Sequence, residues 1–329
     1  MTRGMLAAFV VFGTLPLWIE RVGLYRYLGV EILVWCVFAL GFNLLLGYTG
    51  LPSFGHGAYF GIGAYAMGLT QFHLVANLWV GLLAATLAAA VIGGAVALFI
   101  SHRRGIYFAL MTIAFGQMFF FIASKWTSVT GGEDGLLNIR RLPAAVGPVA
   151  FDLSGNLALS YFAFATFVLV TMLLWRLVHS PFGKVLRAIK QNETRMAYLG
   201  YRVFVYKWAS FTLSCAVAGL AGGLFAMAQG GAYVQVMSLQ WSGVVVLMTL
   251  IGGGLVSFWG PVAGTIVYFV ARDLLGAYTE SWLLWFGLMF MLVVMFKPEG
   301  VAGLWQDAAA RWGARRRART VALQPAEGD

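Results

Sequence analysis

The chain has 329 residues, of which 61% are hydrophobic and 10% are charged, and its formal net charge at pH 7 is +10. Soluble globular domains carry about 25% charged residues, so this composition excludes a soluble domain and indicates a polytopic membrane protein. The two cysteines, Cys36 and Cys215, each lie in an apolar run, which excludes a disulfide framework and the spacing of a cysteine metal site.

Apolar segments of about 20 residues, the length that crosses a bilayer, recur along the chain. In chain order we predict ten spans, over residues 5–19, 27–46, 55–72, 78–100, 106–124, 157–178, 208–228, 241–256, 261–275 and 282–296. The first is short, but it lacks the small-residue cleavage site of a signal peptide, so it counts as a span. We therefore expect an all-α transmembrane domain over residues 1–304 and a basic tail over residues 305–329.

The distribution of basic residues orients these spans. If the amino terminus is cytoplasmic and ten spans alternate, most Lys and Arg residues, including those of the tail, fall on the cytoplasmic side, as the positive-inside rule requires. Both termini are then cytoplasmic. We expect a disordered tail that attracts anionic lipid headgroups rather than nucleic acid.

The ten spans divide into two halves of five, and an odd number per half makes the halves run in opposite directions. Inverted repeats of this kind are common in transporters. A short echo exists between residues 50–54, GLPSF, and residues 254–258, GLVSF. Both copies lie on the cytoplasmic side in this topology, so we interpret the echo as chance.

The most polar stretch is the loop over residues 179–207, which a bilayer could not hold. Its single acid is Glu193, and its basic residues are Lys184, Arg187, Lys190, Arg195, Arg202 and Lys207. Apolar and basic positions recur at helical spacing. We expect Gly183 to open a first helix, Asn192 to cap a second one, and Gly200 to end it. We interpret the loop as a cytoplasmic docking surface.

A second informative stretch covers residues 47–65, GYTGLPSFGHGAYFGIGAY. Gly and Pro interrupt helices and leave backbone N–H and C=O groups without helical partners, and at membrane depth these groups must be satisfied by other protein or by a water-filled cavity. This stretch therefore predicts a broken segment beside a translocation path. The alternative is close helix packing through GxxxG pairs, at residues 57/61, 219/223 and 260/264. His56 either hydrogen-bonds locally or faces the path.

The span over residues 106–124 carries a mixed stripe of Phe108, Thr112, Gly116 and Phe119. Gln117 projects about 140° away from Thr112, so the two polar side chains do not share a face. Either could line a pore or form a hydrogen bond between helices.

The loop over residues 125–156, which falls on the outer side, is long for a connector, and this length indicates a functional contact. Its glycines Gly131, Gly132 and Gly135 surround Glu133 and Asp134. Two adjacent acids alone do not make a metal site.

Enzyme signatures are missing, because the chain contains no Walker loop, HExxH or GxSxG motif. Glu31, Arg272 and Asp273 map near the outer ends of spans, which does not suggest a proton or sodium relay. A transporter of this kind must take its energy from a partner, and the cytoplasmic loop is where that partner would act.

Four stretches and the ending resemble the LivM-type membrane subunit of bacterial ABC importers for branched-chain amino acids, a family with relatives for urea, short amides and small organic acids. The stretches are residues 40–65, 104–117, 130–136 and 181–226, and the ending is FKPEGVAGL. Two departures stand out. Glu133 replaces a small polar residue, and the acidic-alanine opening of other importers' coupling loops is absent.

The resemblance implies an importer of the bacterial inner membrane. Its partners would be a second, homologous permease subunit in a heterodimer, two cytoplasmic ATPase subunits and a periplasmic binding protein. ATP and magnesium would bind the ATPases, with no cofactor in this chain. An ATP-independent carrier and a non-transport scaffold are the rival interpretations.

By motif, the resemblance carries roles onto three groups of residues. The ATPase-coupling group comprises Gly183, Lys184, Arg187, Asn192, Glu193, Arg195 and Gly200. The translocation-path group comprises Tyr48, Ser53, His56 and Tyr59, to which we add Thr112 and Gln117. The group facing the binding protein comprises Gly131, Gly132 and Gly135, to which we add Glu133 and Asp134.

Overall fold

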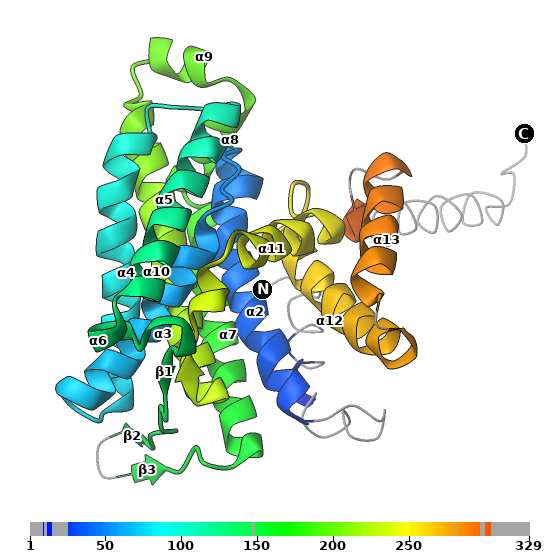
Figure 1. Cartoon of the computed structure of the whole chain (residues 1–329). Coiled ribbons are helices and arrows are strands. Elements are labelled where there is room, and N and C mark those ends of the chain that lie inside the picture. Colours follow the sequence, from blue (N-terminus) through cyan, green and yellow to red (C-terminus); the bar gives the residue numbers. More distant parts are fainter. Residues whose placement is uncertain are drawn as a thin grey trace, which may run out of the picture.

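The computed structural model describes residues 9, 12–14, 26–146, 149–279, 281–296 and 300–303. Most of the first predicted span and the whole basic tail lie outside the described residues. The remaining chain is a bundle of helices with short connections (Figure 1), so the all-α prediction is confirmed.

Nine helices of 14 residues or more make up the described bundle. They are α2 (Arg26–Asn43), α3 (His56–His73), α4 (Leu78–Ile100), α5 (Gly105–Lys125), α7 (Asn156–His179), α10 (Val203–Gln229), α11 (Leu239–Gly252), α12 (Gly260–Tyr278) and α13 (Trp282–Phe296). A π-helical segment, η2 (Leu44–Thr49), prolongs α2. Five segments are long and apolar enough to cross a membrane, namely residues 27–49, 78–100, 105–125, 156–179 and 203–229. The total of ten spans stays a prediction.

The two predicted loops lie at opposite ends of the bundle (Figure 1). One end carries α8 (Pro181–Gln191) and α9 (Glu193–Tyr198), and we call it the α8 end. The other carries α6 (Thr127–Thr130), the 3₁₀ turn η3 (Gly132–Asp134), and a hairpin of β2 (Ala144–Val146) with β3 (Val149–Phe151), and we call it the hairpin end. Here β1 (Leu136–Leu137) pairs antiparallel with β4 (Gly231–Ala232), which joins the outer loop to the end of α10.

Helix α10 packs at the centre through small residues. A Cβ atom at Gly222 would overlap the backbone carbonyl of Phe60 in α3, and one at Gly219 would overlap Ala85 and Ala89 in α4. Close van der Waals packing of small residues is a main source of association between membrane helices. The three GxxxG pairs named in the sequence all make such close contacts, so their packing role is confirmed.

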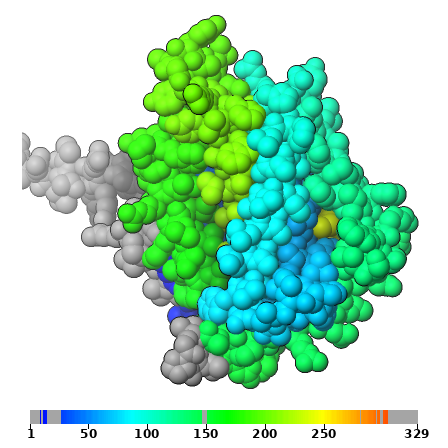
Figure 2. All heavy atoms as spheres, turned by 90° about the vertical axis from the view of Figure 1, so that its left-hand side faces the viewer, coloured from blue at the N-terminus to red at the C-terminus, as the bar shows by residue number. Residues whose placement is uncertain are grey.

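The outward faces of α4 and α7 are apolar. Figure 2 shows α4 in cyan and α7 in green on either side of a strip of α10. A groove of about 350 Å³ lies between these three helices, bounded by Trp79, Phe162 and Leu220 among other apolar side chains. Because the exposed residues are hydrophobic and the helices have spanning length, this face suits contact with lipid.

The bundle contains two interruptions, which enter the interior from opposite ends. Residues 50–55 leave η2 at the α8 end without helical structure before α3 begins, and Gly50 lies against Lys190 of α8. Residues 230–238 follow α10 at the hairpin end and include β4 and the 3₁₀ turn η4 (Val234–Met237) before α11 begins. The order helix, interruption, helix thus occurs twice with opposite direction, as an inverted repeat requires.

The predicted span over residues 241–256 is wrong in its bounds. Helix α11 has only 14 residues, about 21 Å at 1.5 Å per residue, whereas the hydrocarbon core is about 30 Å thick. The helix ends because Gly253 adopts a left-handed conformation with φ of 83°, which is a common helix stop. Residues 253–259 form a turn to α12 at the α8 end, beside the other copy of the GLPSF echo.

Candidate functional site

Helix α8 begins at Pro181, two residues before the predicted start at Gly183. Proline is well suited to the first helical position because the missing N–H would have no partner there. Gly183 instead allows α8 to fold back against α7, since a Cβ atom at Gly183 would overlap the backbone of Val178. The physical reason for glycine at this position is therefore close approach, and not helix initiation.

The predicted caps of α9 are confirmed. The Asn192 side chain accepts a hydrogen bond from the backbone N–H of Arg195 at 2.9 Å, and Glu193 lies in the first turn, where a carboxylate complements the helix dipole. Gly200 follows the helix with φ of 85°. A small apolar cluster of Ile189, Met196 and Val203 joins α8, α9 and the start of α10.

The single acid of this loop is turned inward. Glu193 Oε1 lies 3.3 Å from Nζ of Lys207, whose side chain is 1% exposed, and Lys207 also donates to the Arg103 carbonyl at 2.6 Å. Glu193 thereby joins α9 to α10 and to the α4–α5 connection. Its partner is a lysine of its own chain. By contrast, Lys184, Arg187 and Arg195 are exposed, and they give the α8 end a basic surface.

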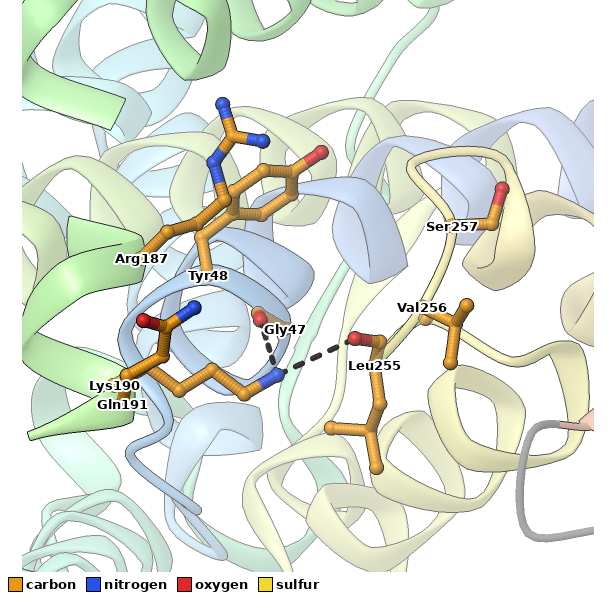
Figure 3. Close-up of a pocket in the computed structure, with 9 residues that line it drawn as sticks. Gly47, Tyr48, Arg187, Lys190, Gln191, Leu255, Val256 and Ser257 are labelled. Carbon is orange, nitrogen blue, oxygen red and sulfur yellow. Dashed lines mark hydrogen bonds between the residues drawn. The ribbon is translucent and has the colours of Figure 1, made fainter. Parts of the chain in front are cut away.

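A cavity of about 330 Å³ lies beneath α8 (Figure 3). Lys190 Nζ donates to the Gly47 carbonyl at 2.7 Å and to the Leu255 carbonyl at 3.3 Å, and burial lowers the pKa of this ammonium below its ordinary value. The Arg187 guanidinium lies over the ring of Tyr48, 5.8 Å from its centre. The lining residues are Gly47, Tyr48, Arg187, Lys190, Gln191, Gly254, Leu255, Val256 and Ser257. None of them is acidic.

His56 lies in the interior at the start of α3 and is fully buried. Its Nε2 lies 2.7 Å from Ser214 Oγ, and its Nδ1 lies 3.1 Å from Ser53 Oγ. Because the Ser214 hydroxyl donates to the Gly41 carbonyl at 2.8 Å, it accepts from Nε2–H, and Nδ1 accepts from Ser53. The geometry favours the local hydrogen-bonding alternative for His56, and a role in the path stays a prediction.

Thr112 of α5 holds the first interruption in place. Its hydroxyl accepts a hydrogen bond from the Phe54 N–H at 3.1 Å and donates to the Ala109 carbonyl at 2.7 Å. One turn on, Gly116 packs directly on Gly55. Both residues belong to the predicted stripe of α5, and this stripe faces the interruption.

Five of the six predicted path residues gather around residues 50–55, and one does not. Ser53, His56, Tyr59 and Thr112 are buried, while Tyr48 lines the cavity beneath α8. Gln117 is exposed on the outer face of α5, so it does not share the face of Thr112, as predicted.

Sequence reasoning missed the second interruption, where the first turns of α3 and α11 meet. The Gly57 N–H donates to Ser242 Oγ at 2.9 Å, and a Cβ atom at Gly61 would overlap the side chain of Met237. Two helix amino-terminal turns, each with a partial positive charge, thus lie together in the interior. The available signal was the Gly230–Gly231 pair after α10 and the serine cap Ser238.

At the hairpin end, glycine shapes the predicted outer-loop motif. Gly131, Gly132 and Gly135 have φ between 67° and 76°, conformations that side chains with a Cβ rarely adopt. Glu133 and Asp134 are exposed between them. The Lys125–Glu133 pair, at 3.7 Å and with both side chains exposed, contributes little to stability, which leaves the acids available to a partner.

Two arginines connect separate elements of the bundle, and neither role was predicted from the sequence. Arg141 donates to the Ser154 carbonyl, to Asn156 Oδ1 and to the Ala228 carbonyl, so it anchors the outer loop to α7 and α10. Arg272 of α12 pairs with Glu31 of α2 at 3.2 Å.

Interrupted helices that meet inside a bundle of apolar helices are a common feature of membrane transporters. Residues 26–297 match the family described as branched-chain amino acid transport system / permease component, and the chain belongs to this family. The resemblance seen in the sequence is confirmed. The family is a transport component, and the chain is a transport subunit rather than an enzyme.

Among its relatives are the high-affinity branched-chain amino acid transport system permease proteins LivM of Salmonella typhimurium and Escherichia coli. Each is 27% identical over 289 residues, which cover 82% of this chain and 68% of the relative. A probable branched-chain amino acid transport permease protein LivM of Methanocaldococcus jannaschii is 25% identical over 82% of this chain and 92% of its own. No solved structure matches this chain.

Proposed function

We propose that this chain is one of two membrane-spanning permease subunits of an ABC importer for branched-chain or chemically related amino acids, and that a soluble binding protein delivers the substrate. The observation that carries the proposal is the combination of a basic, solvent-exposed helix pair at one end with two interrupted helices that meet in the interior. The family membership and the LivM relatives support the substrate class.

The α8 end is the surface for an ATPase. Lys184, Arg187 and Arg195 are exposed there, and the loop's one acid is engaged by Lys207, so the surface presents cations without compensating carboxylates. Such a surface favours a partner with acidic groups through electrostatic complementarity. ATP and magnesium belong to two ATPase subunits, and α8 and α9 receive the movement that hydrolysis drives.

The meeting point of α3 and α11 is the core of the translocation path. Amino-terminal turns of interrupted helices favour a carboxylate, and carbonyl groups of interrupted backbone favour a cation. A zwitterionic amino acid carries both charges. A second, homologous permease subunit completes the path from the opposite side, and alternating access exposes the site first to one end and then to the other.

This function implies an orientation of the bundle in the membrane. The α8 end is cytoplasmic and the hairpin end is periplasmic, with both termini inside and the chain in the bacterial inner membrane. Residues 1–304 form the permease, and residues 305–329 contact lipid headgroups. The acids Glu133 and Asp134, held by Gly131, Gly132 and Gly135, face the binding protein.

The test is purification of the intact assembly followed by reconstitution. We expect two ATPases, a second permease and a binding protein to accompany this chain, and we expect ATP-dependent uptake of labelled leucine in proteoliposomes. Arg187→Glu should release the ATPases, whereas Arg140→Glu at the hairpin end should retain them. Uptake of urea or acetamide in place of leucine would reassign the substrate. Uptake that needs no ATP and stops when ion gradients collapse would overturn the proposal in favour of a secondary carrier.

A further inference from the structure

One side chain of α8 bridges two separate parts of the bundle. The Lys190 ammonium donates to the carbonyls of Gly47 and Leu255 (Figure 3). Gly47 belongs to η2, and Leu255 belongs to the turn between α11 and α12. These two backbone segments also touch each other, since a Cβ atom at Gly47 would lie 2.6 Å from the Gly254 carbonyl oxygen.

The two acceptors lie at the carboxyl end of a helix and in the turn just beyond one. Carbonyls at the carboxyl ends of helices lack intrahelical donors and carry partial negative charge. For Gly47 the residue five positions later, which would donate in a π-helix, is Pro52, and proline has no N–H. The Leu255 carbonyl follows the glycine stop of α11. An ammonium is the natural donor for both.

Each bridged segment leads to one of the two interruptions. From Gly47 the chain runs through η2 and residues 50–55 into the first turn of α3. From Leu255 it runs back along α11 to the interruption over residues 230–238. The helices that follow the two interruptions, α3 and α11, meet where the Gly57 N–H donates to Ser242 Oγ. We call η2 with residues 50–55 the η2 arm, and α11 with the turn that follows it the α11 arm. Lys190 contacts both arms at the α8 end, and both lead to the meeting point of α3 and α11.

We propose that Lys190 is the positioning residue through which movement of α8 reaches both interrupted helices. This inference rests on the proposed function, in which α8 follows an ATPase. The bond to Gly47 is 2.7 Å and the bond to Leu255 is 3.3 Å, so a shift of α8 by about half an ångström exceeds hydrogen-bonding distance for the longer bond first. The α11 arm then separates from the η2 arm, and the surrounding cavity of about 330 Å³ leaves room for this change.

Other basic residues of α8 do not make this connection. Arg187 donates to the Val178 carbonyl at 3.2 Å, which lies at the end of α7 and directly precedes α8 in the chain. Gln191 lines the same cavity, yet within the described part of the chain its side chain has no hydrogen-bond partner. It therefore offers a matched control in the next position of the helix.

The test uses the reconstituted full assembly and measures substrate molecules imported per ATP hydrolysed, together with stimulation of hydrolysis by loaded binding protein. Lys190→Met keeps an unbranched side chain of most of the length and removes the donor. We expect about a tenfold fall in import per ATP, within the range typical of energetic coupling between two sites. Lys190→Arg, whose guanidinium can donate to both carbonyls, should restore most of the ratio, and Gln191→Met should leave it unchanged.

A Lys190→Met assembly that imports as much substrate per ATP as the wild type would overturn the inference, as would an equal loss in Gln191→Met. If Lys190→Met does not assemble, Lys190→Gln, which removes the positive charge and shortens the side chain by one atom, decides the question by the same ratio. A wild-type preparation without ATPase subunits or ATP-driven uptake would instead contradict the proposed function, so the two failures are distinguishable.

Discussion

The Thr112→Val substitution tests whether a side chain of α5 holds the first interruption. Valine has nearly the shape of threonine but cannot accept the hydrogen bond from the Phe54 N–H. Thr112 is 1% exposed, so water does not readily replace the lost acceptor. An unsatisfied buried amide costs about 1–3 kcal/mol. In a chain of this size that corresponds to a melting temperature lower by about 1–4 °C.

Thr86→Val is the matched control because the Thr86 hydroxyl also bonds a carbonyl of its own helix, at 2.8 Å, but receives no bond from another element among the described residues. Thermal unfolding of the purified assembly measures both variants, and leucine uptake measures their activity. We expect a clear loss of stability and uptake for Thr112→Val and a small effect for Thr86→Val. Equal effects of the two variants would refute the assignment of Thr112 to the interruption.

Three further predictions concern packing and charge. Gly222→Ala should lower the free energy of unfolding by about 1–3 kcal/mol because the new methyl group overlaps α3. Gly243→Ala is the control, since there is open space around Gly243, and it should raise helix stability by up to about 1 kcal/mol. Thermal unfolding measures the melting temperatures of both variants. Glu193→Gln should lower the free energy of unfolding by about 1–2 kcal/mol, less than the loss of a fully buried ion pair, because the Glu193 side chain is 27% exposed beside Lys207. An unchanged melting temperature would contradict a stabilising Glu193–Lys207 pair. Arg141→Met should speed proteolysis within residues 125–156, and an unchanged rate would contradict its anchoring role.

Sequence patterns predicted the features that obey local rules. The loop over residues 179–207 was evident because six basic residues interrupt an apolar chain. The roles of Asn192 and Gly200 followed from cap preferences that involve only a few neighbouring residues. Gly183 shows the limit of local rules. A glycine near the start of a helical pattern suggests that it begins the helix. In the structure, glycine is needed at position 183 because the backbone of α7 lies too close for a side chain, and the local sequence pattern does not contain this contact.

Long-range pairs were not predictable because a single sequence carries no signal for them. The bond between Gly57 and Ser242 spans 185 residues, and the bond between Lys190 and Gly47 spans 143. Residues 230–238 looked like an ordinary connection until their contact with α3 was known. The echo of GLPSF shows that local similarity alone does not establish a repeat, in agreement with its interpretation as chance. The structure places both at the α8 end, so they cannot be equivalent positions of inverted halves.

Three polar groups of the backbone at or beside the first interruption are satisfied by side chains of other helices. Thr112 of α5 accepts from Phe54, Ser242 of α11 accepts from Gly57, and Lys190 of α8 donates to Gly47. A buried polar group of this kind costs about 1–3 kcal/mol if it is left without a partner. The interrupted backbone is therefore stable only while these side-chain partners stay in place. A movement that removes one partner changes which arrangement of the η2 arm and the α11 arm is stable. Of the three, Lys190 alone lies on the solvent-exposed helix pair, which is the element that a soluble partner can reach.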